Sequence, residues 1–350
     1  MKYTEITKEF TEEFFKEVDA SKNIIITSHF SPDGDSISSV LSMYRIITDK
    51  YKDKNVKIVY SNELDEHFKY FENFEKIEWV KDVSDYLMKF DLLIMLDCGN
   101  YSRFTKYPEK IQEVKNQICI DHHASLSSDF KLSTIIPSIS SCSELIFRLF
   151  EEHITLDKNL AETFLLGILT DTGNFAFLDG AQSETLLIAK KLIDAGNISI
   201  NTLRSNYIGI SKREFNLVSE FIKNTSFGKV EGWPPFQYTF IRKEFIESEN
   251  YTSNEIGTAS SSYIAGYLTS LAGYTWGFIV KPKSNYCSVS MRALPGSVNV
   301  RDIVERMSIG GGHDRAAAGI FKKDDDPKEP RVCIEKIIEW MENNKPQLTK

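Results

Sequence analysis

Apolar residues gather in short runs along the first half of the chain, separated by segments in which polar and apolar positions alternate with helical spacing. The apolar runs cover residues 23–27, 56–61, 91–96 and 117–120. Runs of this length are typical of parallel strands that are covered on both faces. Amphipathic helices are predicted at 36–50, 143–152 and 158–169. This alternation predicts an α/β domain built on a doubly wound, mostly parallel sheet.

The second half of the chain has a different pattern. Residues 196–228 are polar and mostly helical, which suits a linker. Beyond them, strands are predicted at 235–241, 274–281 and 286–293, and helices at 254–272, 299–308 and 331–343. We therefore expect a catalytic domain at 1–195, a helical linker at 196–228 and a smaller α+β domain at 229–350, with an active-site cleft between the two domains.

Composition narrows the class of protein. The 350-residue chain has a net charge of -8, and a protein that grips long nucleic acid needs a basic surface. Its five cysteines form no C-x-x-C pair, and such spacing in a chain of this length favours free thiols in a reducing compartment. No apolar run approaches the ~20 residues of a membrane span. We expect a soluble, cytoplasmic protein without a membrane partner.

Metal-ligating residue types stand where several predicted elements end. They are His29, Asp33 and Asp35 after the first strand, Asp97 after the third, Asp121, His122 and His123 after the fourth, and Asp171 at a helix end. A single such Asp is usually a helix N-cap, and a single His is usually a structural hydrogen-bonding group. The carboxyl ends of parallel strands meet at one edge of a sheet. Carboxylates gathered there would repel one another unless a cation lay among them, so the sequence predicts a metal centre.

The ligand types indicate which metal. Carboxylates and imidazoles without a thiolate favour Mn²⁺ or a similar divalent ion over structural zinc. The number of groups is too large for one ion. A pair of ions about 3.5–4 Å apart, bridged by an Asp, would polarise a phosphoryl group and activate water.

Five sequence motifs resemble those of one family. In chain order, HFSPDGDS, LDCGN, DHH and TDTGNF are similar to the four motifs of the DHH phosphoesterases, and GGGHDRAAAG is similar to the signature of the DHHA1 domain. The resemblance covers essentially the whole chain. Size and layout are most similar to the stand-alone nanoRNase (oligoribonuclease)/pAp-phosphatases and to cyclic-di-AMP and pApA phosphodiesterases.

The resemblance implies roles for the clustered residues. One metal ion would be held by His29, Asp33 and Asp97, and a second by Asp35, Asp97, His122 and Asp171, with Asp97 bridging. His123 would face the substrate phosphate, and Asp121 would orient a neighbouring histidine. Mn²⁺ is favoured for both ions, and Mg²⁺, Co²⁺ and Fe²⁺ stay open.

In the second domain the resemblance points to phosphate binding. Backbone N–H groups of Gly310, Gly311 and Gly312 would form an anion-binding nest beside His313. Arg292 would clamp a phosphate through two hydrogen bonds. Residues 254–270 match the family pattern poorly, so the resemblance implies nothing about base recognition there.

These features together predict a metal-dependent phosphodiesterase. It would cleave very short RNA or dinucleotides such as pApA to mononucleotides, with pAp phosphatase activity as a further possibility. Long nucleic acid is not expected as a partner, because the chain offers no basic track. Two alternatives stay open: a dedicated cyclic-di-AMP phosphodiesterase, and a non-catalytic nucleotide sensor. A homodimer is an expectation from the resemblance only.

Overall fold

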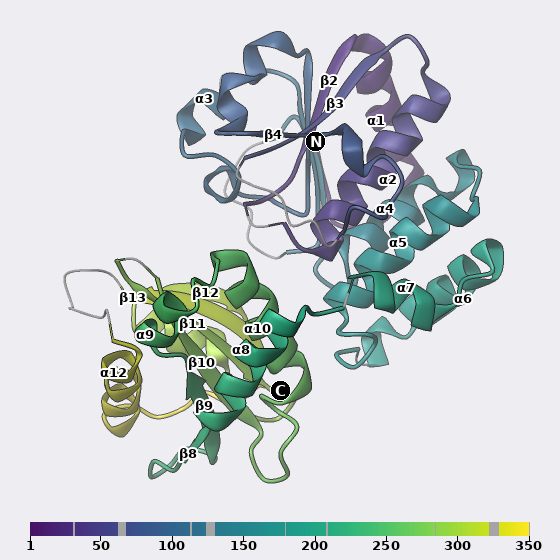
Figure 1. Ribbon diagram of the computed structural model, residues 1–350. Coiled ribbons are helices and arrows are strands. Elements are labelled where there is room, and N and C mark those ends of the chain that lie inside the picture. The colour runs from purple at the N-terminus through teal and green to yellow at the C-terminus, as the bar shows by residue number, and fades with distance from the viewer. Residues whose placement is uncertain are drawn as a thin grey trace. The chain divides into compact units, whose positions relative to one another are not determined.

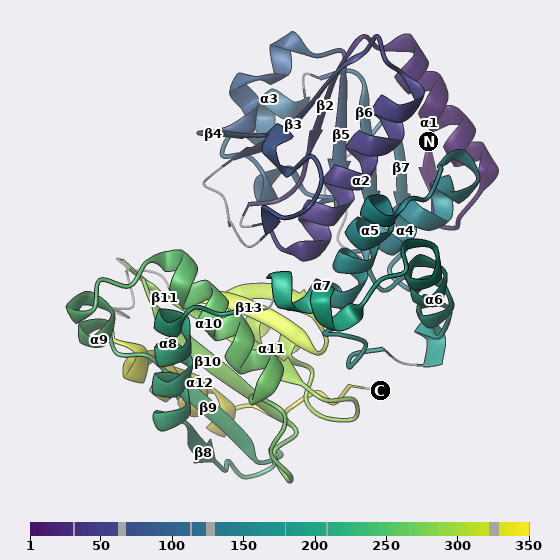
Figure 2. The same ribbon diagram turned by 45° about the vertical axis from the view of Figure 1, so that its right-hand side comes forward.

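Two β-sheets organise the chain, one in each of two units, Met1–Gly209 and Ile210–Lys350. The computed structural model describes residues 1–30, 32–61, 68–112, 114–123, 130–178, 180–207, 209–283, 285–321 and 329–349. Figures 1 and 2 show the elements of each unit from two directions.

The first unit is built on a seven-stranded sheet in which every described pairing is parallel. Its strands are β1 (Lys2–Tyr3), β2 (Asn23–Thr27), β3 (Asn55–Ser61), β4 (Ile77–Val80), β5 (Leu92–Leu96), β6 (Gln117–Asp121) and β7 (Leu132–Ile135). The four predicted strands are confirmed as β2, β3, β5 and β6. The doubly wound α/β prediction is therefore confirmed, with three further strands at the sides of the sheet.

Helices of the first unit cover the sheet unequally. They are α1 (Lys8–Ala20), α2 (Gly34–Lys50), α3 (Pro108–Gln112), α4 (Cys142–Phe150), α5 (Lys158–Asp171), α6 (Glu184–Gly196) and α7 (Ile200–Tyr207). Alternate strand residues point to opposite faces, so Ile24 and Ile26 pack in the large core under α1, α2, α4 and α5. Ile25 packs on the other face, in a smaller core that includes Ile111 of α3. Figure 1 shows α3 on the opposite side of the sheet from α1 and α2.

The strand order reverses at the centre of this sheet. The order is β1-β7-β6-β5-β2-β3-β4, so the chain builds outward from β2 in one direction and from β5 in the other. Ligands of open parallel sheets bind beyond the carboxyl ends of the strands at such a reversal. His29 follows β2 and Asp97 follows β5, so these two residues flank the reversal.

Polar side chains fix where the helices near this edge begin. Asp33 caps α2 by accepting a 3.0 Å hydrogen bond from the amide of Ser36. Ser141 caps α4 in the same way, with the amide of Glu144 as donor. The Glu144 carboxylate does not complete the capping box that the Ser-x-x-Glu spacing suggests. It accepts hydrogen bonds from Ser140 and Thr185 instead, which ties α4 to α6.

The second unit has a six-stranded mixed sheet in the order β12-β13-β11-β10-β9-β8. Its strands are β8 (Ser226–Gly228), β9 (Phe236–Phe240), β10 (Trp276–Pro282), β11 (Cys287–Ala293), β12 (Gly310–His313) and β13 (Ala316–Phe321). Its helices are α8 (Lys212–Lys223), α9 (Lys243–Ser248), α10 (Ser253–Gly266), α11 (Val300–Arg306) and α12 (Pro330–Glu342). The predicted smaller α+β domain is confirmed, although α10 ends at Gly266 rather than near residue 272.

Two details differ from the prediction. Gly310–His313 forms the edge strand β12, paired antiparallel with β13, in place of the expected nest. The expected linker contains two helices that belong to different units: α7 lies in the first, whereas Leu217 and Phe221 of α8 pack in a core of the second. Among the described residues, none of the helices combines the length and apolar character that crossing a bilayer would require.

Candidate metal centre

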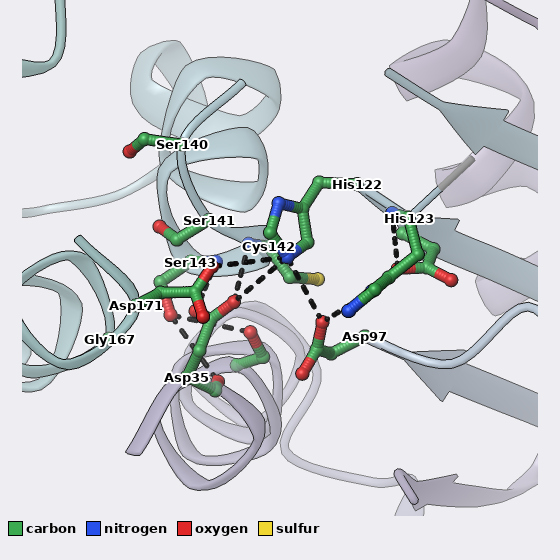
Figure 3. A network of polar contacts seen from close by, with 12 residues as sticks. Asp35, Asp97, His122, His123, Ser140, Ser141, Cys142, Ser143, Gly167 and Asp171 are labelled. Atoms are coloured by element: carbon green, nitrogen blue, oxygen red, sulfur yellow. Dashed lines mark hydrogen bonds and ion pairs between the residues drawn. The ribbon is translucent and has the colours of Figure 1, made fainter. Parts of the chain in front are cut away.

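Seven of the predicted residues converge beyond the carboxyl edge of the first sheet. Their ligand atoms form three overlapping groups, each with all atoms within 4.8 Å of one another: Asp97, His122 and His123; His29, Asp33 and Asp97; and Asp35, His122 and Asp171. The groups share Asp97 and His122, so they form one continuous centre. Figure 3 shows the part around Asp35, Asp97, His122 and Asp171.

Asp97 is the centre of this arrangement. Its side chain is 2% exposed, and its backbone has a φ of 55°, a left-handed conformation that is uncommon for residues other than glycine. Its Oδ2 lies 3.2 Å from His29 Nε2, and its Oδ1 lies 3.5 Å from His122 Nε2 and 3.3 Å from His123 Nδ1. Backbone strain of this kind, held at the end of a buried strand, is typical of a functional site.

Asp35 lies on the other side of His122. It sits in the first turn of α2 and is held by the first turn of α4, where the amides of Cys142 and Ser143 donate hydrogen bonds of 2.6 and 2.9 Å to its two carboxylate oxygens. Figure 3 shows Cys142 and Ser143 beside Asp35. The partial positive charge of a helix N-terminus favours an ionised carboxylate in this place.

Two histidines present the same ring nitrogen to the centre. Nδ1 of His29 lies 2.8 Å from the carbonyl oxygen of Phe30, and Nδ1 of His122 lies 3.2 Å from that of Ile139. A carbonyl can only accept, so in each ring Nδ1 carries the proton and donates it. In the neutral ring, which is the form that binds a metal ion, Nε2 then has the lone pair and faces the carboxylates.

Charges in the centre perturb one another strongly. Burial raises the pKa of the Asp35 carboxyl well above its usual range, and the neighbouring carboxylates of Asp97 and Asp171 raise it further. Burial alone would also raise the pKa of Asp97, but the surrounding imidazoles, His122 foremost, hold it well below the usual range. Strongly perturbed pKa values in neighbouring carboxyl groups, raised in one and lowered in the other, are typical of functional sites.

The residues fit divalent ions. Within the part of the chain that the structure describes, Asp97 Oδ1 and His122 Nε2 are buried and make no hydrogen bond. His122 Nε2 lies 3.3 Å from Asp171 Oδ2 and 3.9 Å from Asp35 Oδ2. Two ligand atoms that each lie about 2.1 Å from one ion are roughly 3.0–3.4 Å apart at tetrahedral to octahedral angles. The 3.3 Å separation falls in this range, and carboxylate oxygens and imidazole nitrogens are common ligands of divalent metal ions.

Comparisons with known proteins give the family. The sequence model of the DHH family, N-terminal domain, matches residues 23–168, and that of the DHHA1 domain matches residues 236–343. The chain belongs to the DHH/DHHA1 phosphoesterases.

Individual relatives in the family align over most of this chain. The bifunctional oligoribonuclease and PAP phosphatase NrnA of Mycoplasma genitalium is 24% identical over 90% of this chain and 94% of its own length. The protein of the same name from Bacillus subtilis is 26% identical over 89% and 94%. The cyclic-di-AMP phosphodiesterase PdeA of Listeria monocytogenes is 26% identical over 86% of this chain, but over only 45% of its own length.

A solved structure supports the fold as a whole. An exopolyphosphatase-related protein from Bacteroides fragilis matches with a TM-score of 0.83 at 22% identity, over 97% of this chain and 98% of its own. At this identity the match shows the shared DHH/DHHA1 fold alone. The metal dependence of the DHH family agrees with the grouped Asp and His residues described above.

The remaining predicted residues of this DHH phosphoesterase lie around the centre or on the second unit. Asp121 Oδ1 lies 2.8 Å from His123 Nδ1 and accepts a 3.0 Å hydrogen bond from the His123 amide. The His123 side chain is 21% exposed, more than those of His29 and His122. Asp121 is thus placed to orient His123, and His123 is the histidine of the centre that is most open to solvent.

In the DHHA1 domain, Arg292 and His313 share one face of the sheet. Arg292 on β11 pairs with Ala316 on β13, which in turn pairs with His313 on β12. Ala316, which lies between them, has only a methyl group as its side chain. The longer side chains of Arg292 and His313 therefore stand on either side of a residue that rises little above the sheet. Gly311 lies two residues before His313 on β12. A Cβ added to it would meet nothing within 4 Å, so the packing of neighbouring atoms does not require a glycine there.

Sequence reasoning missed the groups that hold the ligands in place. These are the amides of Cys142 and Ser143, the Ile139 carbonyl and Gly167. The backbone groups leave no trace in the sequence, because each residue type has them. Gly167 did offer a signal: a glycine inside a predicted helix usually has a packing reason.

Proposed function

We propose that this protein is a manganese-dependent phosphodiesterase that hydrolyses very short RNA and dinucleotides such as pApA to mononucleotides, and that it also removes phosphate from pAp. The observation that carries the proposal is the centre of grouped Asp and His ligands. It lies in a chain that aligns with two relatives named bifunctional oligoribonuclease and PAP phosphatase over 90% and 89% of this chain.

The proposed roles follow the geometry of the centre. His29, Asp33 and Asp97 would hold one ion, and Asp35, Asp97, His122 and Asp171 the other, which is the division that the grouped ligand atoms support. When bound, the two ions would supply charge stabilisation at the phosphoryl oxygens and lower the pKa of water. The ions would also relieve the repulsion among the Asp35, Asp97 and Asp171 carboxylates.

The chain's own groups would complete the reaction. His123, partly exposed and hydrogen-bonded to Asp121, would contact the reacting phosphate and donate a proton to the leaving oxygen. Arg292 and His313 would bind a terminal phosphate of the substrate, with the Gly311 backbone leaving room for it. The net charge of -8 supports short substrates, because long polyanions need many basic contacts.

The test is product analysis with the purified protein and Mn²⁺. Equimolar pApA, pAp, cyclic-di-AMP and a 24-residue RNA would be incubated together and resolved by chromatography. The proposal expects pApA to be converted to AMP first, pAp more slowly, and the long RNA to persist. Four unchanged substrates, with Mn²⁺ binding shown separately by calorimetry, would contradict it and favour a nucleotide sensor.

A second candidate has one observation in its favour. PdeA of Listeria monocytogenes and GdpP of Bacillus subtilis, both named cyclic-di-AMP phosphodiesterases, align over 86% of this chain. Faster hydrolysis of cyclic-di-AMP than of pApA in the same mixture would make that the principal activity.

A further inference from the structure

Lys281 occupies an unusual position on the sheet of the DHHA1 domain. In β11 every second residue is buried, and the residues between them, Ser288 included, are partly accessible. Lys281 of β10 pairs with Ser288 and therefore lies on this accessible face of the sheet. Its ammonium Nζ lies 3.1 Å from Ser260 Oγ of α10 and 3.4 Å from Ser290 Oγ of β11. Ser290 is two residues before Arg292, so Lys281 points toward the arginine proposed to bind phosphate.

The surroundings of this ammonium are positive. Within the described ranges of the chain, no carboxylate forms an ion pair with Lys281, and the charged groups that act on it are Lys283 and Arg292. Burial foremost, and then the neighbouring cations of Lys283 and Arg292, lower the pKa of Lys281 to about 8. A partly buried lysine ordinarily has an acidic partner, because removing its charge from water is costly.

A structural role does not explain this arrangement. The hydroxyl of the buried Ser260 already donates a 2.9 Å hydrogen bond to the Gly257 carbonyl, so it needs no second partner. A neutral side chain at position 281 would satisfy the same neighbours without the repulsion from Arg292. The charge therefore costs folding free energy, and a bound anion would offset that cost.

We propose that Lys281, placed by Ser260 and Ser290, forms a second phosphate subsite beside Arg292, and that it selects nucleotides carrying two phosphate groups over those carrying one. An ammonium has three N–H donors, and the two serines take two of them, which leaves one for a phosphate oxygen. Nζ of Lys281 lies beside Ser290, and Ser290 and Arg292 are two residues apart on β11, roughly 6.8 Å along the strand, so the two cations can each hold a separate phosphate group. The inference rests on the proposed function for the nature of the ligand, a nucleotide phosphate.

The test measures binding without catalysis. Full-length protein in excess EDTA is titrated by calorimetry with pAp, AMP, inorganic phosphate and adenosine. We expect the wild type to bind pAp more tightly than AMP, and Lys281→Met to lose that preference, by roughly 10–100-fold in Kd for pAp, as for a hydrogen bond to a charged group. Lys229→Met removes an exposed lysine of the same unit and should leave every affinity unchanged.

Other readouts separate the possible failures. Lys281→Arg keeps the charge and should retain a preference for pAp, and thermal unfolding of each variant verifies its fold. An unchanged preference in Lys281→Met, or no nucleotide binding by the metal-free wild type, overturns the inference. Turnover of pApA with Mn²⁺ is measured in parallel: its absence despite intact binding contradicts the proposed function alone. Normal turnover with an unchanged pAp preference in Lys281→Met contradicts the subsite alone.

Discussion

Gly167 of α5 lies directly against Asp35 of α2. A Cβ placed on Gly167 would come within 2.7 Å of Asp35 Oδ1 and 2.0 Å of Ser143 Oγ. The Ser143 amide is one of the two that hold the Asp35 carboxylate. Because Gly167 has no side chain, α5 can approach both Ser143 and Asp35 this closely. The glycine is therefore part of the support of the metal centre.

Replacing Gly167 with Ala should damage the centre more than the fold. Forcing a methyl group into this contact costs about 1–3 kcal/mol, partly offset by the better helix propensity of alanine. We expect Asp35 to shift and the affinity for Mn²⁺ to fall by roughly 10–100-fold, as for the loss of a group that orients a ligand. Calorimetric titration with Mn²⁺ measures this.

Gly257→Ala is the matched control, because a Cβ there would meet nothing within 4 Å in another helix. It should be neutral or stabilising by up to ~1 kcal/mol, with Mn²⁺ affinity unchanged. Equal Mn²⁺ affinity in both variants would show that Gly167 does not support the centre.

Asp171→Ala should abolish turnover while the fold persists. Asp171 ends α5 with its side chain 31% exposed, so its loss leaves no large cavity. Removing a proposed ligand should lower kcat by at least roughly 100-fold. The wild type should also gain thermal stability with Mn²⁺, by ~2.7 kcal/mol at 100 times Kd, and the variant should lose that gain. The exposed Asp194→Ala is the control, and wild-type turnover in Asp171→Ala would refute the assignment.

The sequence predicted the parts of the centre that depend on strand ends. His29 and Asp97 follow apolar runs, and parallel strands bring such positions to one edge. Other parts depend on contacts between distant segments: Asp35 is held by amides more than 100 residues away, at Cys142 and Ser143. The sequence did not predict that Gly310–His313 forms a strand, because pairing with β13, rather than local propensity, decides the conformation of this glycine-rich segment.

Asp121→Asn should distinguish the proposed role of His123, which is to contact the phosphate, from that of His29 and His122, which is to hold the metal ions. His123 Nδ1 lies 2.8 Å from Asp121 Oδ1, and an amide can offer its N–H there and favour the wrong tautomer of the ring. We expect kcat to fall by roughly 10–100-fold with Mn²⁺ affinity nearly unchanged. Parallel kinetics and calorimetry decide this. A large loss of Mn²⁺ binding would instead make His123 a ligand, as its 3.3 Å approach to Asp97 allows.

Lys281 should make the stability of the metal-free protein depend on pH in the alkaline range. Its pKa is lowered from 10.5 to about 8 by burial and by the cations of Lys283 and Arg292, so between these values the unfolded chain binds more protons than the folded one. The free energy of unfolding therefore rises with pH across this window, by on the order of 1–3 kcal/mol.

Lys281→Met removes this dependence, and its effect on stability has a distinctive sign. At pH 7 the variant should be more stable than the wild type in phosphate-free buffer, because the burial of a charge and its repulsion from Lys283 and Arg292 are gone. Urea unfolding at pH 7, 8.5 and 10 measures both effects, with Lys229→Met as the control. A variant that is less stable than the wild type at pH 7, with an unaltered pH dependence, would mean that the Lys281 charge stabilises the fold.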